Sequence, residues 1–271
     1  MTDITLTHLY TYPIKSCGSL SHKEIALDAR GPLWDRRWMV TDGDGKVITQ
    51  RELPAMALIQ PRFENGNLAL TAPNMPEICV PLGREAGEIW RVEVWDDICA
   101  AWDEGEEFAD WFSDYLHVDA RLVRMADGFV RAVDPDYAPP NTPVGFADGY
   151  PILIVSDASL DELNRRLIER DKPPVPISRF RPNIVVTGAS AFAEDNWDAV
   201  QIGDVTLDVV KPCARCVLTS VDQLTGTVPD TAEPLATLNT FRKQNNKVMF
   251  AQNAIHRAPG TLRVGEQLKL L

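Results

Sequence analysis

Residues 37–49 read RWMVTDGDGKVIT, and this stretch carries the pattern that decides the fold. Two runs containing β-branched and aromatic residues, 37–41 and 46–49, flank the turn residues DGDG. Because Gly and Asp tolerate positive φ, the pattern predicts a β-hairpin. The pattern recurs with runs 57–63 and 68–72 around residues 64–67, and with runs 89–95 and 98–102 around residues 96–97. We therefore expect a meandering sheet or barrel over the first hundred residues.

The hydrophobic period changes after this meander. Apolar residues then recur at three- and four-residue spacing, at Phe108, Trp111, Phe112, Tyr115 and Leu116. This spacing predicts an amphipathic helix of about three turns. Residues 125–150 are rich in Asp, Gly and Pro and show little periodicity, which is typical of a long functional loop. We place a domain boundary near residue 120, dividing the chain into 1–120 and 121–271.

The second half is again predicted to be mostly strands. A buried strand at 151–155 precedes Ser156 and Asp157, whose side chains can cap a helix that ends near Arg170. The remaining segments are strands at 183–187, 204–211, 216–221, 247–252 and 261–271, and a weak helix at 234–244. The expected fold class is mainly β with a few helices (α+β), with a β-barrel-like domain in each half.

Composition narrows the functional classes. The 271 residues carry a formal net charge of -12, so the overall field repels nucleic acid and anionic membranes. The N-terminus lacks the features of a secretion signal, and no apolar run reaches the roughly 18 residues of a membrane-spanning helix. We expect a cytoplasmic protein without membrane or nucleic-acid partners, whose five cysteines are reduced thiols.

Basic residues stand at the ends of several predicted strands. They are Lys15 beside Ser16, Arg36 with Arg37, Arg179 with Arg181 just before Asn183, and Lys211 with Arg215. A buried cation needs a partner, and Arg and Lys at strand ends suit a small molecule that carries a phosphate. Any single one of them could instead pair with one of the 39 carboxylates, so their clustering carries the argument.

Cys213 and Cys216 form a lone C-x-x-C pair. A zinc half-site would need further ligands, and a thioredoxin-type pair would normally open a helix, whereas the following residues are predicted to form a strand. Two small residues entering a strand are the plain structural alternative. Lys211 and Arg215 would favour the thiolate, the form that binds soft metals. Common hydrolase, P-loop, zincin and dinucleotide-binding motifs do not occur in the sequence.

The chain resembles the MOSC-domain proteins of the amidoxime-reducing type, which carry an N-terminal β-barrel domain before the MOSC domain. The motifs that carry the resemblance are LYTYPIKSC (9–17), DRRWMV (35–40), FRPNIV (180–185), Trp197, IGD (202–204), CARCVLTSVD (213–222) and PGTLRVGE (259–266). They occur in order and span nearly the whole chain. The family includes the mitochondrial amidoxime-reducing component and bacterial reductases of N-hydroxylated bases.

The resemblance implies a reductase of N-hydroxylated compounds that uses the molybdenum cofactor, in which a pterin dithiolene and one protein thiolate hold the metal. By resemblance, Cys216 is that metal ligand and catalytic residue. Lys15, Ser16 and Arg36 would contact the pterin phosphate, and Ser156, Arg181, Asn183 and Arg215 would complete the site. The substrate would be a small N-hydroxylated compound, and electrons would come from a separate redox protein. A carrier that binds the cofactor or sulfur without turnover is the alternative.

Overall fold

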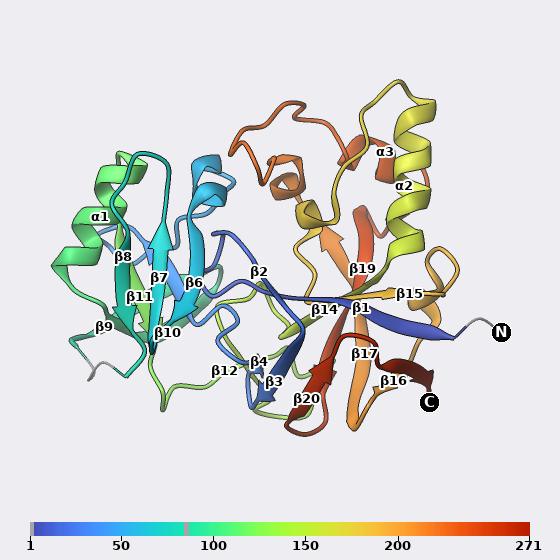
Figure 1. Cartoon of the computed structure of the whole chain (residues 1–271), viewed down its shortest axis with the longest axis horizontal. Helices are drawn as coiled ribbons and strands as arrows, with labels where there is room; N and C mark the ends of the chain where they lie inside the picture. The colour runs from blue at the N-terminus through green and yellow to red at the C-terminus, as the bar shows by residue number, and fades with distance from the viewer. Residues whose placement is uncertain (1–2, 84–86) are drawn as a thin grey trace.

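The structure is a computed structural model that describes residues 3–83 and 87–271 (Figure 1). Over these residues the protein is mainly β with three α-helices, as the sequence predicts. The helices are α1 (Glu106–Leu116), α2 (Asp157–Glu169) and α3 (Leu235–Asn239). Within the described part of the chain, none of them is long and apolar enough to cross a membrane.

The second half is built around a closed barrel of seven strands. In barrel order the strands are β14 (Ile152–Ser156), β15 (Ile184–Thr187), β1 (Ile4–Thr11), β21 (Gln267–Leu270), β16 (Ala199–Ile202), β17 (Val205–Arg215) and β19 (Lys247–His256). Pairing of β19 with β14 closes the ring. The short strands β2 (Leu20–His22) and β18 (Lys243–Gln244) extend it beside β1 and β19. Apolar side chains that alternate along these strands fill the interior, as a small barrel requires.

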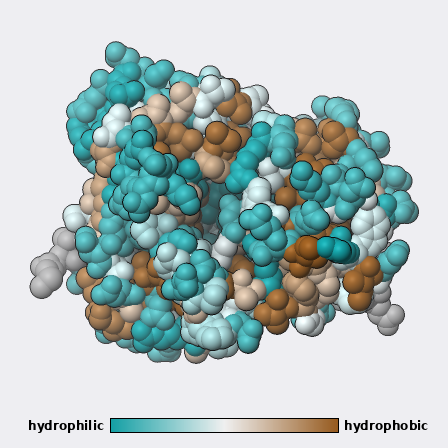
Figure 2. Space-filling model, turned by 180° about the vertical axis from the view of Figure 1, so that it is seen from behind, coloured by the Kyte–Doolittle hydropathy of each residue, from teal (hydrophilic) through white to brown (hydrophobic). Residues whose placement is uncertain are grey.

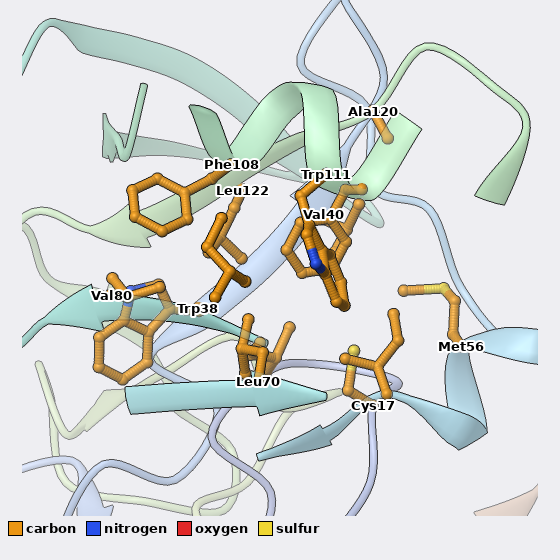
Figure 3. Close-up of a cluster of buried hydrophobic side chains, with 14 of the residues drawn as sticks. Cys17, Trp38, Val40, Met56, Leu70, Val80, Phe108, Trp111, Ala120 and Leu122 are labelled. Atoms are coloured by element: carbon orange, nitrogen blue, oxygen red, sulfur yellow. The ribbon is translucent and has the colours of Figure 1, made fainter. Parts of the chain in front are cut away.

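The first half contains the predicted meander. One sheet joins β5 (Trp38–Thr41), β11 (Arg121–Met125), β10 (Asp97–Asp103) and β9 (Ile89–Val94), and a second joins β6 (Gln60–Glu64), β7 (Asn67–Thr71) and β8 (Ile78–Pro81). Helix α1 covers the core between them, where Phe108 and Trp111 meet Trp38, Val40 and Leu70 (Figure 3). The buried indole nitrogen of Trp38 donates to Glu104 at 2.7 Å, so this core tolerates a buried carboxylate.

The N-terminal segment crosses from one half to the other. Strand β1 pairs with β15 and β21 of the barrel, and β3 (Glu24–Asp28) joins β4 (Gly31–Pro32) to β20 (Gly260–Arg263) (Figure 1). The chain then enters the first half at β5. The division at residue 120 stays a prediction, and these strand pairs cross it. As a consequence, Lys15 and Ser16 of the site lie a few residues after the end of barrel strand β1.

Several predicted elements are corrected. Residues 46–49 make two isolated bridges, Thr41 with Val47 and Lys46 with Glu93, in place of a strand. Residues 216–221 form the 3-10 helix Val217–Ser220 where a strand was expected. That helix forms because Thr219 donates both its backbone N–H and its hydroxyl to the carbonyl of Cys216. The helix at 234–244 is shortened to α3, and strand 204–211 extends to Arg215 as β17. The loop 125–150 contains only the short pair β12 (Arg131–Ala132) and β13 (Pro143–Val144).

Candidate active site

A cavity of about 310 Å³ lies where the two halves meet. Its walls come from the segment after β1, the turn before β5, the end of the 125–150 loop, the segment before β15, and the last residues of β17. The residues lining it include Lys15, Ser16, Arg36, Ala147, Asp148, Tyr150, Arg181, Asn183, Lys211, Cys213, Arg215, Cys216, Lys247 and Asn253. Figure 2, from behind, shows a surface hollowed between the two halves with many hydrophilic side chains around it.

The charge of this cavity is opposite to that of the whole protein. Six of its lining residues are basic, namely Lys15, Arg36, Arg181, Lys211, Arg215 and Lys247, and Asp148 is the lining carboxylate. The chain as a whole carries a formal charge of -12. Basic side chains gathered in a cleft with protein walls focus a positive potential there. The cavity is therefore suited to an anionic ligand.

Two arginines share one aromatic ring at the cavity wall. The guanidinium carbons of Arg36 and Arg181 both lie 4.2 Å from the ring centroid of buried Tyr12. Arg36 donates to Asp35 at 2.6 Å and to the side-chain oxygen of Asn183 at 3.2 Å. Burial lowers the pKa of Arg181 to about 10. Two guanidinium groups held this close repel each other, so an anion bound beside them would stabilise the arrangement.

The backbone at this wall is unusual. Ser16, Arg36 and Arg181 have φ values of 66°, 47° and 54°, in the left-handed region that non-glycine residues seldom occupy. Such conformations cost free energy and cluster at functional sites. In addition, Nη2 of Arg181 and Nε of Arg215 are buried without a hydrogen-bond partner among the residues that the structure describes. These unpartnered donors fit a site that receives an anionic group.

Lys15 and Asp148 form an ion pair in the cavity lining. The Lys15 ammonium lies 2.5 Å from Asp148 and also donates to the carbonyl of Phe146 at 2.8 Å. Burial lowers the pKa of Lys15, and Asp148 partly opposes that effect. Desolvation by the cavity walls works against ionisation of Asp148, but Lys15, Arg51 and the Trp95 N–H outweigh it and hold the pKa of Asp148 below its usual range. The Asp148 side chain is 67% exposed, so solvent screens this pair.

The two cysteines have different surroundings. The sulfur of Cys216 accepts two hydrogen bonds from Arg51, at 3.4 Å from Nε and 3.3 Å from Nη2. The sulfur of Cys213 accepts one from Nη1 of Arg215 at 2.9 Å. Both are free thiols. Strand β17 breaks its pairing register with β19 on both sides of Lys211 and Pro212, and such bulges re-aim side chains next to a site.

Seven of the eight predicted site residues line the cavity: Lys15, Ser16, Arg36, Arg181, Asn183, Arg215 and Cys216. Ser156 does not. It ends β14 fully buried, and its backbone N–H donates to Glu194. Its hydroxyl has no hydrogen-bond partner within residues 3–83 and 87–271 and makes no cap bond to α2. The expected capping by Ser156 is therefore wrong, because the buried Glu194 carboxylate lies at this helix start.

Sequence reasoning missed three residues of the site: Arg51, Trp95 and Asp148. The Arg51 guanidinium stacks 4.1 Å from the Trp95 ring centroid and lies 3.9 Å from Asp148. Arg51 follows the run 46–49, so the rule that singled out basic residues at strand ends could have found it. Trp95 ends the predicted run 89–95, and nothing in that pattern marks it as a site residue, although it is 40% exposed. Nothing in the loop sequence distinguishes Asp148 from its acidic neighbours.

Comparison with known proteins agrees with the motifs. The MOSC N-terminal beta barrel domain matches residues 3–119, and the MOSC domain matches residues 141–269. Mitochondrial amidoxime reducing component 2 of Bos taurus is 38% identical, over 88% of this chain and 72% of its own length. Mitochondrial amidoxime-reducing component 1 of Mus musculus is 35% identical (98% and 82%), and that of Homo sapiens is 32% identical (98% and 83%). The chain belongs to the MOSC-domain family of amidoxime-reducing components.

Proposed function

We propose that this protein reduces N-hydroxylated compounds with the molybdenum cofactor bound in the cavity between its halves. One observation carries the proposal: six basic side chains and the Cys216 thiol converge in one cavity of an acidic protein. The relatives named above are amidoxime-reducing components, which supports an oxidoreductase acting on an N–OH group. The proposed substrate class is small N-hydroxylated compounds such as amidoximes.

The residues present fit this cofactor. A phosphate suits the guanidinium groups of Arg36 and Arg181, and the unpartnered nitrogen of Arg181 supplies a donor for it. Lys15, Ser16, Asn183 and Arg215 would bind the remaining polar edge of the pterin. Cys216 would ligate the metal, because its thiolate is a soft sulfur ligand, like the dithiolene sulfurs of the cofactor. When bound, the cofactor supplies the two-electron redox step that removes the substrate oxygen.

The chain's own residues would bind and orient the substrate beside the cofactor. Reduction of an N–OH group to N–H consumes two electrons and two protons and releases water. The ionised Asp148 faces the cavity and could accept a hydrogen bond from a substrate nitrogen. Lys211 lies over the rings of Tyr137 and Tyr150, at 3.9 and 5.8 Å from their centroids, and this cluster forms a wall against which a flat substrate could pack.

Electrons would arrive from a separate redox protein, since the sequence carries no dinucleotide-binding motif. A partner with a basic contact surface would approach this acidic chain fastest. We further propose a cytoplasmic location, with no nucleic-acid or membrane partner.

The test is reduction of an aromatic amidoxime by the purified protein, expressed in a host that makes the cofactor, with a reduced viologen dye as electron donor. Formation of the amidine with oxidation of two dye equivalents per turnover is the expected result. Molybdenum bound without any amidine formed would instead indicate a carrier. Zinc in place of molybdenum would indicate a site built on Cys213 and Cys216, and either outcome would overturn the proposal.

A further inference from the structure

We propose that Arg51 is a positioning residue for Cys216: two N–H groups of its guanidinium, brought from the first half of the chain, fix the sulfur that ligates the cofactor. The proposal rests on the proposed function. Its observation is the pair of contacts from Nε and Nη2 to the Cys216 sulfur, at 3.4 and 3.3 Å. Both distances are within hydrogen-bonding range for a sulfur acceptor.

Local structure holds Arg51 in place. Its backbone N–H donates to the Thr49 hydroxyl at 3.2 Å, and the Glu52 carboxylate accepts the Thr49 N–H at 3.0 Å. These two bonds, together with the Glu52 N–H donated to the Thr49 carbonyl, close the turn from which the Arg51 side chain extends. The guanidinium then stacks on Trp95 and lies near Asp148. A long side chain fixed at both ends loses little further freedom on meeting the sulfur.

The contact joins the two halves of the molecule beside the cavity. Arg51 follows the turn after β5, whereas Cys216 directly follows barrel strand β17. The neighbouring Gln50 makes a reciprocal amide pair with Gln223, at 2.8 and 3.2 Å, and donates to the carbonyl of Ser16 at 2.6 Å. The turn that carries Arg51 is thereby docked on the second half through the buried Gln50 and the half-buried Gln223. The distance between guanidinium and sulfur is set by this docking.

Hydrogen bonds to a metal ligand orient it and tune its donor strength. Removal of such an outer partner typically weakens metal binding about 10- to 100-fold. A positive charge alone would act differently from two directed N–H groups, because a lysine ammonium is a point charge that cannot reproduce the planar pair. The two substitutions Arg51→Gln and Arg51→Lys therefore separate charge from geometry.

The experiment compares wild-type protein with Arg51→Gln, Arg51→Lys and the control Arg62→Gln, all expressed in a host that makes the cofactor. Arg62 is an exposed arginine of β6 whose partners are Glu64 and Glu77, outside the cavity. Three quantities are measured: molybdenum per chain, the rate of cofactor loss on dilution, and the visible absorption that arises from sulfur bound to the metal. Thermal unfolding of each cofactor-free protein checks the fold.

We expect Arg51→Gln to lose cofactor about 10- to 100-fold faster than wild-type protein, with a shifted absorption band. The rate of cofactor loss from Arg51→Lys should lie between those of wild type and Arg51→Gln. The rate and spectrum of Arg62→Gln should match those of wild type. Wild-type rate and spectrum in a folded Arg51→Gln protein would overturn the role of Arg51 while leaving the proposed function intact. A wild-type rate and spectrum in Arg51→Lys would overturn the claim that two directed N–H groups, and not charge alone, hold the sulfur. A wild-type protein without molybdenum would overturn both proposals. Should Arg51→Gln fail to fold, Arg51→Lys decides by the same two readouts.

Discussion

At the scale of single residues, Tyr12 explains how two buried arginines stand side by side. Its ring lies against both guanidinium groups, and its hydroxyl donates to the carbonyl of Pro182 at 3.0 Å. Burial raises the pKa of Tyr12 well above its usual value, so the ring stays neutral. Asp35 compensates Arg36 directly, whereas Arg181 keeps one nitrogen without a partner in the described part of the chain. The site thus holds spare positive charge at Arg181.

This difference predicts that alanine substitutions at Arg181 and Lys15 reduce cofactor retention by different amounts. Arg181→Ala should reduce cofactor retention roughly 10- to 100-fold, as expected for the loss of one charge-assisted contact of about 1.5–3 kcal/mol. Lys15→Ala should have a smaller effect, because the Lys15 ammonium is already paired with Asp148 and Phe146. Molybdenum content of the purified variants measures both effects, with Arg165→Ala, at an exposed position of α2, as the control. Full occupancy in Arg181→Ala would contradict the assignment.

Substitutions of the two cysteines should also differ in their effect on activity. Cys216→Ser replaces a soft thiolate with a hard hydroxyl and should abolish dye-driven reduction of an amidoxime. Cys213→Ser should keep appreciable activity, since the Cys213 sulfur is held by Arg215 and not by Arg51. The measurement is the rate of amidine formation at saturating dye. Equal loss in both variants would indicate a redox pair of cysteines.

At the scale of elements, local patterns predicted the pieces that depend on local physics. The hairpin at residues 60–71 and helix α1 follow from turn residues and hydrophobic spacing, and the structure confirms both. The strand predicted at 216–221 is wrong because Thr219 bonds back to Cys216 and closes a 3-10 turn. The bulges of β17 depend on its pairing with β19, which no window of sequence contains. Basic strand ends marked the cavity and could have included Arg51, but only the fold shows that Arg51 contacts the Cys216 sulfur.

The junction of β14, α2 and the 3-10 helix Ala193–Asn196 contains a buried carboxylate with a measurable pH signature. Burial raises the pKa of Glu194 above its ordinary value of 4.5, although Ser159 and the Ser156 N–H donate to it. From pH 4.5 upward the folded state then binds more protons than the unfolded state. The stability contributed by the neutral group therefore falls as pH rises through the raised pKa.

Glu194→Gln removes this titration and should gain stability relative to wild type as pH rises from 4.5. The gain corresponds to about 1.4 kcal/mol for each unit by which the pKa is raised, and it levels off above the folded pKa. Thermal unfolding of both proteins between pH 4.5 and neutrality is the measurement, with Glu107→Gln, at an exposed position of α1, as a control. A difference between wild type and Glu194→Gln that is constant over this range would contradict the inference.

At the scale of the whole molecule, an acidic exterior surrounds a basic cavity formed only when both halves fold together. Cys17 and Cys99 are buried in separate cores, and Cys79 is exposed on β8. Over the described residues, no three His, Cys, Asp or Glu side chains are grouped so that they could hold a metal ion. An iron–sulfur cluster would need about four cysteines together.

The cofactor-loaded chain should therefore not complete a cycle with a nicotinamide donor alone. With an N-hydroxylated substrate, a reduced viologen dye should support turnover, whereas NADH without a second protein should not. Product formation under the two conditions, at matched reducing equivalents, is the measurement. Robust turnover with NADH alone would show that the chain accepts hydride electrons directly and would contradict a separate donor protein.

The central claim is that molybdenum binds in this cavity through the sulfur of Cys216. X-ray absorption at the molybdenum edge tests it most directly, because it counts the sulfur atoms around the metal in wild-type protein and in Cys216→Ser. We predict that wild-type protein contains molybdenum and that the molybdenum retained by Cys216→Ser has one sulfur neighbour fewer. The same number of sulfur neighbours in both proteins would contradict the account.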